Sequence, residues 1–433
     1  MTRPVTRRDL LVYADWQGLP GSQLLGTLTV TPDRGREIFS FAYAPAWLAS
    51  PFAQVLDPAL QLYAGPQYQP EGQANFGLFL DSAPDRWGRV LMERREAALA
   101  RQQGRPSRKL LEADYLLGVY DGHRLGGLRF REQADGPFLD DDPTRAAPPW
   151  ASLRELEYAS LQLEQAGAAG QPDYLRWLAQ LVAPGSSLGG ARPKASVVDP
   201  DGSLWIAKFP SVHDGHDVGA WEAVVNELAS AAGLVVAEGR AQRFHSRHHT
   251  FLSRRFDRTA GQAERRHFAS ALTLLGYADG TSHQDGTSYL ELAEWLMARG
   301  AAPATDLPEL WRRIAFNVCV SNTDDHLRNH GFLLTAEGWR LAPAYDLNPI
   351  PHGYGLKLNI SETYNALDLD LVREVAPLFR LSAGQSRAIL ARVVAAVRTW
   401  PAVADRYGIG REEQQRLRPA FAVTEAAGLD LAP

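Results

Sequence analysis

Cysteine is almost absent from this sequence of 433 residues, and the single Cys319 excludes both an intrachain disulfide and a cysteine-rich metal site. Cys319 lies in an apolar run, so we expect a small buried side chain rather than a nucleophile. The sequence also lacks an uninterrupted apolar run long enough to span a bilayer, and no apolar segment follows its N-terminal residues as in a secretory signal. These absences make the cytoplasm the expected location.

A strong excess of charge of one sign is also missing, because the net charge is only −5. No block of Lys or Arg dominates, so strong direct binding to nucleic acid is not expected. The stretch 240–258 is locally basic and permits two interpretations, a nucleic-acid patch or a solvated surface with salt bridges. Nearby acidic residues favour the solvated surface.

The pattern of apolar residues predicts three successive parts, because a chain of this length is too long for one compact core. Residues 1–140 are β-rich, residues 141–265 combine helices with a Gly/Ser loop and a hairpin, and residues 266–433 are mainly helical. The helices expected in the last part lie at 287–299, 307–321, 370–379, 384–398 and 410–426. The predicted fold class is therefore α+β, two-lobed, with a β-rich N-terminal subdomain and a mainly helical C-terminal lobe.

The most informative segment is the polar stretch 321–332, which follows an apolar helix and precedes a predicted strand. Asp324 and Asn329 are five residues apart, the spacing of the base and the metal-binding Asn in the catalytic loop of protein kinases. Asp346 follows after a strand, a turn and a strand, where that template places a metal-binding carboxylate. Asn329 and Asp346 would supply the oxygen ligands that Mg²⁺ prefers.

The neighbours of Asp324 leave alternatives open. Asp325 competes for the role of the base, but it is four residues from Asn329 instead of five. As an isolated pair, the two aspartates would be interpreted as helix caps or turn residues, and the later Asn329 and Asp346 favour the catalytic interpretation. We expect His326 to orient the loop by hydrogen bonds rather than to bind metal, because Mg²⁺ prefers oxygen ligands.

The middle part offers residues that could grip a nucleotide. The segment 185–194 is a loop of small residues whose backbone N–H groups can approach phosphates, although flexible Gly/Ser loops are common. Lys208 ends an apolar strand, where its ammonium group needs a negatively charged partner, and ATP phosphates and a helix carboxylate are suitable partners. Glu227, on the following helix, is the expected carboxylate.

Taken together, these segments resemble the HipA family, the kinase toxins of toxin–antitoxin modules. The resemblance covers nearly the whole chain and rests on the segments 84–89, 126–130, 187–194, 254–258, 322–332 and 344–347. It implies a divergent, two-lobed protein-kinase-like fold and an ATP- and Mg²⁺-dependent kinase that phosphorylates serine or threonine. It also implies a small DNA-binding, HipB-like antitoxin as partner, and a host protein as substrate, an aminoacyl-tRNA synthetase in the best-known case, with growth arrest as the result.

The resemblance assigns roles to individual residues of this chain. It implies Asp324 as catalytic base, Asn329 and Asp346 as Mg²⁺ ligands, and Lys208 as the lysine that binds the ATP phosphates. Autophosphorylation in the family falls on a serine of the phosphate loop, here Ser187 or the adjacent Ser186. The other residues expected to bind ATP are Ser187, Leu188, Gly189, Gly190, Ala191, Lys194, Glu227, His326 and Tyr345.

The pattern departs from that of ordinary protein kinases, because no His-Arg precedes Asp324 and no Phe-Gly follows Asp346. Three rival functions remain. A small-molecule kinase of the aminoglycoside or choline type would normally carry a His where Asn322 stands. A non-catalytic binding or regulatory module would keep the kinase fold. A metal-dependent hydrolase would use Asp324, Asp325 and His326, but further ligands at convincing spacing are missing.

Overall fold

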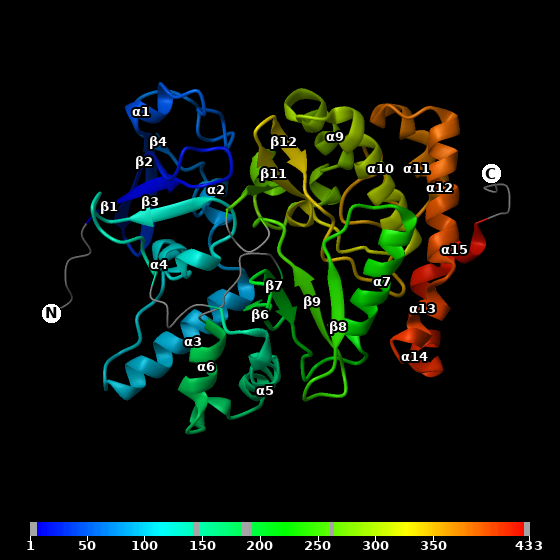
Figure 1. Cartoon of the computed structure of the whole chain (residues 1–433), viewed down its shortest axis with the longest axis horizontal. Helices are drawn as coiled ribbons and strands as arrows, with labels where there is room; N and C mark the ends of the chain where they lie inside the picture. Colours follow the sequence, from blue (N-terminus) through cyan, green and yellow to red (C-terminus); the bar gives the residue numbers. More distant parts are fainter. Residues whose placement is uncertain (1–6, 142–146, 183–189, 191, 260–263, 428–433) are drawn as a thin grey trace. The chain divides into compact units, whose positions relative to one another are not determined.

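The computed structural model describes residues 7–141, 147–182, 190, 192–259 and 264–427 (Figure 1). The chain forms two compact units, the first from residues 1–212 and 257–276, the second from residues 213–256 and 277–433. The first unit is therefore discontinuous, since residues 213–256 leave it for the second unit and residues 257–276 return to it. The three-part division of the sequence stays a prediction.

The first unit contains a five-stranded sheet in the order β4-β3-β2-β1-β5, in which every pairing is antiparallel. Alternate residues of β1 are fully buried, as expected for a strand with one face on the core. Arg34 and Gly35 both have positive φ, the conformation of the two-residue turns that close twisted hairpins. The strands are β1 Arg8–Ala14, β2 Gln23–Asp33, β3 Arg36–Tyr43, β4 Gln67–Tyr68 and β5 Leu128–Arg131.

The rest of the first unit is helical, apart from the β6–β7 hairpin and β10. The long helix α3 begins after its N-cap Asp85, whose side chain accepts a hydrogen bond from Gly88 N. The helix α3 packs against α6, which in turn packs against α5. The elements are α1 Pro45–Leu48, α2 Gly77–Leu80, α3 Arg86–Gln102, α4 Glu112–Leu117, η1 Asp121–His123, η3 Trp150–Ser152, α5 Leu153–Glu164, η4 Ala168–Gly170, α6 Tyr174–Val182, β6 Lys194–Val198, β7 Leu204–Lys208, β10 His267–Ser270 and α8 Ala271–Leu274.

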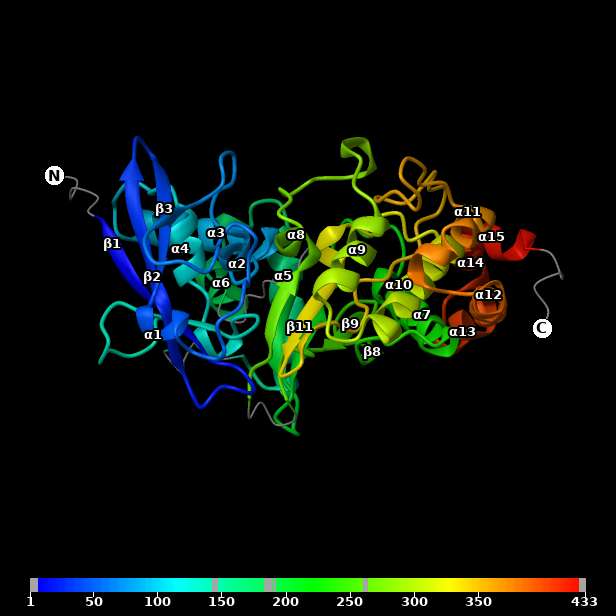
Figure 2. The same cartoon turned by 90° about the horizontal axis from the view of Figure 1, so that it is seen from above.

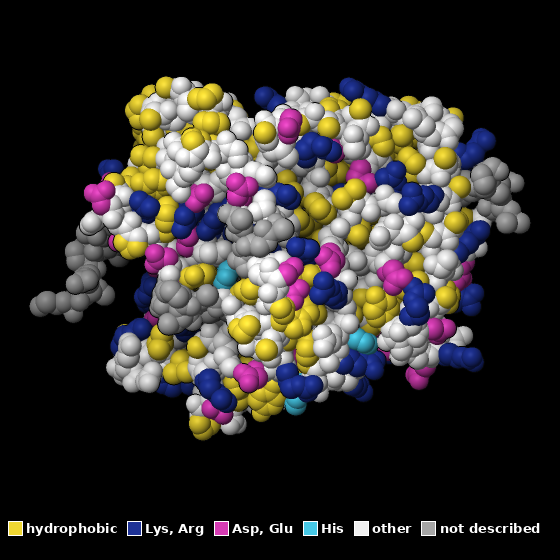
Figure 3. Space-filling view, in the orientation of Figure 1, with side chains coloured by type: hydrophobic (Ala, Val, Ile, Leu, Met, Phe, Trp, Pro, Cys, Tyr) yellow, Lys and Arg dark blue, Asp and Glu magenta, His cyan; other side chains and the backbone are white. Residues whose placement is uncertain are grey.

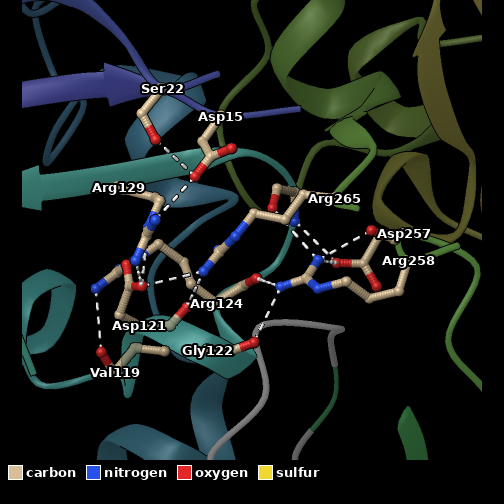
Figure 4. A network of polar contacts seen from close by, with 11 residues as sticks. Asp15, Ser22, Val119, Asp121, Gly122, Arg124, Arg129, Asp257, Arg258 and Arg265 are labelled. Atoms are coloured by element: carbon tan, nitrogen blue, oxygen red, sulfur yellow. Dashed lines mark hydrogen bonds and ion pairs between the residues drawn. The ribbon is translucent and has the colours of Figure 1, made fainter. Parts of the chain in front are cut away.

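A buried network of charges joins the returning segment 257–276 to the rest of the first unit (Figure 4). Asp257 accepts a hydrogen bond from Gly126 N at 3.0 Å and pairs with Arg258 at 2.6 Å. Arg258 in turn donates to the backbone oxygen of Arg124 at 2.7 Å. Arg265 donates to the backbone oxygen of Asp121 at 2.8 Å. These contacts fix the segment, because a buried guanidinium that loses its acceptors is strongly unfavourable.

The same network reaches the sheet through Arg129 of β5. Its guanidinium pairs with Asp121 at 2.6 Å and with Asp15 at 2.9 Å (Figure 4). Arg124, at its centre, is fully buried and donates to backbone oxygens, including that of Leu116 at 2.7 Å. Burial lowers the pKa of Arg124 to about 10, which leaves it charged at neutral pH. The network thus joins strand β1, strand β5 and the returning segment by charge-assisted hydrogen bonds.

The second unit is built around α10, whose residues are almost all buried from Asp306 to Cys319. The helix α12 packs against both α7 and α10, and α13 packs against α7 (Figures 1 and 2). Gly233 ends α7 with a φ of +88°, the left-handed conformation that favours glycine. The elements are α7 Val218–Ala232, β8 Gly239–Gln242, β9 Thr250–Arg254, η6 His283–Asp285, α9 Tyr289–Arg299, α10 Pro303–Cys319, η7 Leu327–Asn329, β11 Gly331–Thr335, β12 Gly338–Leu341, α11 Leu369–Glu374, η8 Ala376–Phe379, α12 Ala383–Val397, α13 Trp400–Arg406, α14 Arg411–Leu417, η9 Arg418–Phe421 and α15 Ala422–Ala426.

The α+β class predicted from the sequence is confirmed, and the differences concern element boundaries. The helix expected at 410–426 is divided into α14, η9 and α15, since Pro419 lacks the N–H that a continuous helix needs. Pro377 divides the helix expected at 370–379 in the same way, into α11 and η8. In the described part of the chain, none of the helices combines the length and the apolar character needed to cross a membrane.

Candidate functional site

The candidate site lies in the second unit, in the loop between α10 and β11. The chain leaves α10 at Cys319, and Ser321 takes a positive φ of 50°, which turns the backbone out of the helix direction. The 3₁₀ helix η7, Leu327–Asn329, then leads into β11. A rigid buried helix and a strand therefore hold both ends of the short polar loop that carries the predicted catalytic residues.

Asp324 and Asp325 are adjacent in the sequence and lie in opposite environments. Asp324 is exposed, whereas the side chain of Asp325 is only 3% exposed. Three side chains converge on Oδ2 of Asp325: the Tyr289 hydroxyl at 2.6 Å, the Asn317 amide at 2.8 Å and the His330 ring at 2.8 Å. Asp325 is therefore a structural centre of the loop, and Asp324 is the aspartate left accessible.

The electrostatics of Asp325 support this division. Burial alone would raise its pKa, but the His330 ring and the hydrogen bonds from His330 and Tyr289 outweigh burial and hold the pKa below its ordinary value. Burial and the Asp325 carboxylate together raise the pKa of Tyr289 well above its ordinary range. The pair therefore consists of a carboxylate that stays ionised and a phenol that stays neutral and donates to it.

Asn329 and Asp346 have the donor atoms for a hard cation. Asn329 is buried, and its amide nitrogen donates to the backbone oxygen of Asp324 at 3.3 Å, which leaves the amide oxygen as an available ligand. Asp346 has a φ of +60°, an uncommon conformation for a residue with a side chain. The amide nitrogen of Asn348 lies 3.4 Å from Oδ1 of Asp346.

Neighbouring contacts hold Asp346 in that conformation. A short bridge pairs Ala344 with Val236, and the Tyr345 hydroxyl donates to the backbone oxygen of Arg328 at 2.5 Å. Oδ1 of Asn348 is buried without a hydrogen-bond partner among the described residues. A buried oxygen of this kind suits a cation or its bound water, so the donor set fits Mg²⁺.

His326 is half-buried, and its Nδ1 is buried without a hydrogen-bond partner in the described part of the chain. Its backbone oxygen accepts a hydrogen bond from Asn329 N at 2.8 Å. The main chain of His326 therefore contributes a hydrogen bond within the loop, and the role expected of its side chain stays a prediction. The ring that orients the loop belongs to His330, which the sequence did not single out.

The predicted hydrolase set is not assembled. No group of three or more His, Cys, Asp or Glu side chains that could hold a metal ion occurs among the described residues. Asp325, one of the three residues of that set, is already hydrogen-bonded to Tyr289, Asn317 and His330. An accessible Asp324 with amide and carboxylate oxygens at Asn329 and Asp346 matches the template of phosphoryl transfer better than that of a zinc-type hydrolase.

In the first unit, Lys194 and Lys208 face each other across the β6–β7 hairpin. The ammonium group of Lys194 is buried and lies 2.9 Å from Oδ2 of Asp85, the N-cap of α3. Burial raises the pKa of Asp85 although the ammonium group of Lys194 pulls it down. This ion pair was not foreseen, and it gives Lys194 a structural task beside its predicted role in binding ATP.

The remaining predicted residues of the phosphate loop fall mostly outside the described residues, which include Gly190 alone. Gly190 has a φ of +91°, in the region that favours glycine. The roles predicted for the others stay predictions: Ser186, Ser187, Leu188, Gly189 and Ala191.

Glu227 lies on α7, and its side chain is 43% exposed and forms an ion pair with Arg406 of α13. The carboxylate buried on the same helix is that of Glu222, which is only 3% exposed. The two residues are five apart and therefore point in different directions on the helix. The role of Glu227 beside Lys208 stays a prediction.

Comparisons with known proteins bear on the family and the fold of the chain. Residues 186–400 match the family model described as the HipA-like C-terminal domain. A protein of Sinorhizobium fredii (strain NBRC 101917 / NGR234), Y4mE, named as a candidate kinase, is 31% identical over 180 residues, which are 37% of this chain and 41% of that protein. The chain thus spans about two-fifths of the length of that relative.

A solved structure gives the fold over almost the full length. A chain of the Shewanella oneidensis MR-1 toxin–antitoxin complex of HipA, HipB and operator DNA matches with a TM-score of 0.65. The match covers 96% of each chain at 16% sequence identity. At that identity the likeness shows the fold alone, and the expected HipA-like fold is confirmed.

Proposed function

We propose that the chain is a protein kinase of the HipA type, because residues 186–400 match the model of the HipA-like C-terminal domain. The reaction we assign to it is the transfer of the terminal phosphoryl group of ATP, with Mg²⁺, to a serine or threonine hydroxyl of a protein. The observation that carries the proposal is the contrast between the accessible Asp324 and the fixed, buried Asp325.

The contrast assigns the roles. Asp324 is the carboxylate positioned to accept the proton of the attacking hydroxyl, because it is exposed and lies on a loop that Asp325 holds rigid. Asn329, through its hydrogen bond to the backbone of Asp324, couples the position of the base to the position of a metal ligand. Asn329 and Asp346 would hold Mg²⁺, which neutralises the charge of the phosphates during transfer.

The nucleotide would be bound at the phosphates by Lys208 and the loop 185–194. Phosphate transfer within the protein would fall on Ser187 or Ser186, and about two negative charges would then stand where the ATP phosphates bind. Repulsion between these charges is a direct physical reason for self-inactivation.

The fold match supports a partner. The matching chain comes from a complex with HipB and operator DNA. We therefore include in the proposal a small, DNA-binding, HipB-like antitoxin as partner of this chain, and a host protein such as an aminoacyl-tRNA synthetase as substrate, with growth arrest as the consequence.

The test compares the wild type, Asp324→Ala and a control variant, Asp405→Ala, which removes an exposed aspartate of α13. Each protein is incubated with ATP and Mg²⁺, and its intact mass and phosphopeptides are measured. We expect phosphate on Ser187 or Ser186 in the wild type and the control, and a rate lower by about 10²–10⁴-fold in Asp324→Ala. Full activity of Asp324→Ala would refute the assignment of the base. Absence of both phosphate and calorimetric ATP binding in the wild type would favour a non-catalytic module.

A further inference from the structure

A basic pocket lies in the second unit, and none of its lining residues belongs to the loop that carries Asp324. Its volume is about 280 Å³. The β8–β9 connection, the turn before α7 and the helix α14 with the turn before it supply its walls. The side chains that decide its chemistry are those of Arg243, Arg247, His248, Arg416, Asp217 and Glu413.

Both carboxylates of the pocket are used for internal hydrogen bonds. Asp217 caps α7 through Ala220 N at 3.1 Å, and its other oxygen lies 2.6 Å from Nδ1 of His249. Oε1 of Glu413 accepts hydrogen bonds from Asp217 N at 3.0 Å and from Trp221 Nε1 at 2.9 Å. The negative charge near the N-terminus of α7 therefore serves mainly to cap this helix and to bind the ring of His249 and the indole of Trp221.

The guanidinium groups are, by contrast, only loosely paired. Arg243 lies 3.9 Å from Asp217, Arg416 lies 4.0 Å from Glu413, and the two arginine side chains are 51% and 53% exposed. On the same hairpin, Arg240 forms a much closer pair with Glu238, at 2.8 Å. At distances near 4 Å and with this exposure an ion pair adds almost nothing to stability, so stability does not explain why these arginines gather here.

The remaining hydrogen bonds position the arginines but use only a few of their N–H donors. Nη1 of Arg416 donates to the backbone oxygen of Gly215 at 3.3 Å, and Nε of Arg247 lies 3.2 Å from Nε2 of His248. Each guanidinium carries five N–H donors, so most of them remain available. Figure 3 shows Lys and Arg side chains mixed with acidic ones over the region of β8, α13 and α14, so this face of the molecule is not uniformly basic.

We propose that this pocket binds the phosphate group of a small ligand, either inorganic phosphate or a nucleoside monophosphate. Arginine forks match the oxygens of a phosphate in pairs, and three of them around a small pocket provide the recognition. The small volume favours a small ligand, because it lies just below the usual range of pockets for small molecules. A nucleic-acid backbone would instead need a stripe of basic side chains.

The test is isothermal titration of the full chain with inorganic phosphate and, separately, with AMP, at low ionic strength and without Mg²⁺. The variants are Arg243→Gln with Arg416→Gln, and the matched control Arg240→Gln, which removes the tightly paired arginine of the same hairpin. Because each lost charged hydrogen bond weakens binding by about tenfold or more, we expect the double variant to bind at least about 10-fold more weakly and the control to bind like the wild type.

Binding of both ligands with similar affinity would identify the phosphate group itself as the ligand, and tighter binding of AMP would identify a nucleotide as the source. Equal affinity in the wild type and the double variant would overturn the proposal, as would the absence of binding by the wild type to either ligand. Binding of duplex DNA without binding of phosphate or AMP would also overturn it. If the double variant unfolds, the single variant Arg247→Gln, which removes an exposed side chain, gives the same comparison.

Discussion

Replacement of Asp325 by alanine removes a carboxylate oxygen on which Tyr289, Asn317 and His330 converge. All four side chains are buried, so no water replaces the lost acceptor without repacking of the loop. Each buried donor that loses its acceptor costs about 1–3 kcal/mol, and removal of one partner from a buried charged pair costs about 3–5 kcal/mol. We therefore expect Asp325→Ala to lower the free energy of unfolding by about 3–5 kcal/mol.

Urea unfolding followed by circular dichroism measures this loss, and Asp324→Ala is the matched control. The neighbouring Asp324 is exposed, and a surface substitution of this kind changes the free energy of unfolding by about 0.5 kcal/mol or less. The two adjacent substitutions should thus give opposite results, with stability lost in one and phosphoryl transfer lost in the other. Equal stability of Asp325→Ala and the wild type would refute the structural role of Asp325.

Three further predictions follow from other contacts. Asp85→Ala should lower the free energy of urea unfolding by about 3–5 kcal/mol, because the ammonium group of Lys194 stays buried without its partner. The double variant Asp85→Asn with Lys194→Met, which removes both charges, should recover most of this free energy. Glu227→Gln should leave the rate of phosphoryl transfer unchanged, because the exposed side chain of Glu227 is paired with Arg406; a slower rate would support its predicted role beside Lys208. The pKa of Asp325 is depressed, so the contribution of its carboxylate to stability is present above the ordinary value of 3.8 and is lost as the pH falls through the folded-state pKa. Urea unfolding across that pH range should therefore show a decrease in the free energy of unfolding of the wild type that is absent in Asp325→Asn.

Local sequence signals located the loop and its neighbours. The apolar helix before Asp324, the strand-turn-strand before Asp346 and the hairpin that ends at Lys208 are all present, because each has a clear apolar period or turn signal. The start of α3 after Asp85 likewise has a cap signal of purely local origin, since Asp85 caps the helix through its own side chain.

The errors concern contacts that no local pattern encodes. The burial of Glu222 and the exposure of Glu227 depend on which face of α7 is covered, and α12 and α13 cover that face from far along the chain. The Asp85–Lys194 pair joins residues that are 109 positions apart. The strand β5 was missed because its alternation is carried by Arg129 and Arg131, whose charges hide a strand in a pattern that looks for apolar residues.

The return of residues 257–276 to the first unit has a consequence for the order in which the chain completes its folding. The ribosome synthesises Asp257, Arg258 and Arg265 only after all of the residues 213–256. The contacts of Arg124 and Asp121 with Arg258 and Arg265 can therefore form only after part of the second unit has been synthesised. The matched family domain at 186–400 contains the returning segment without Asp121 and Arg124. The boundary of the family domain at residue 186 therefore cuts through the first compact unit, so the family domain and the compact units of this protein do not coincide.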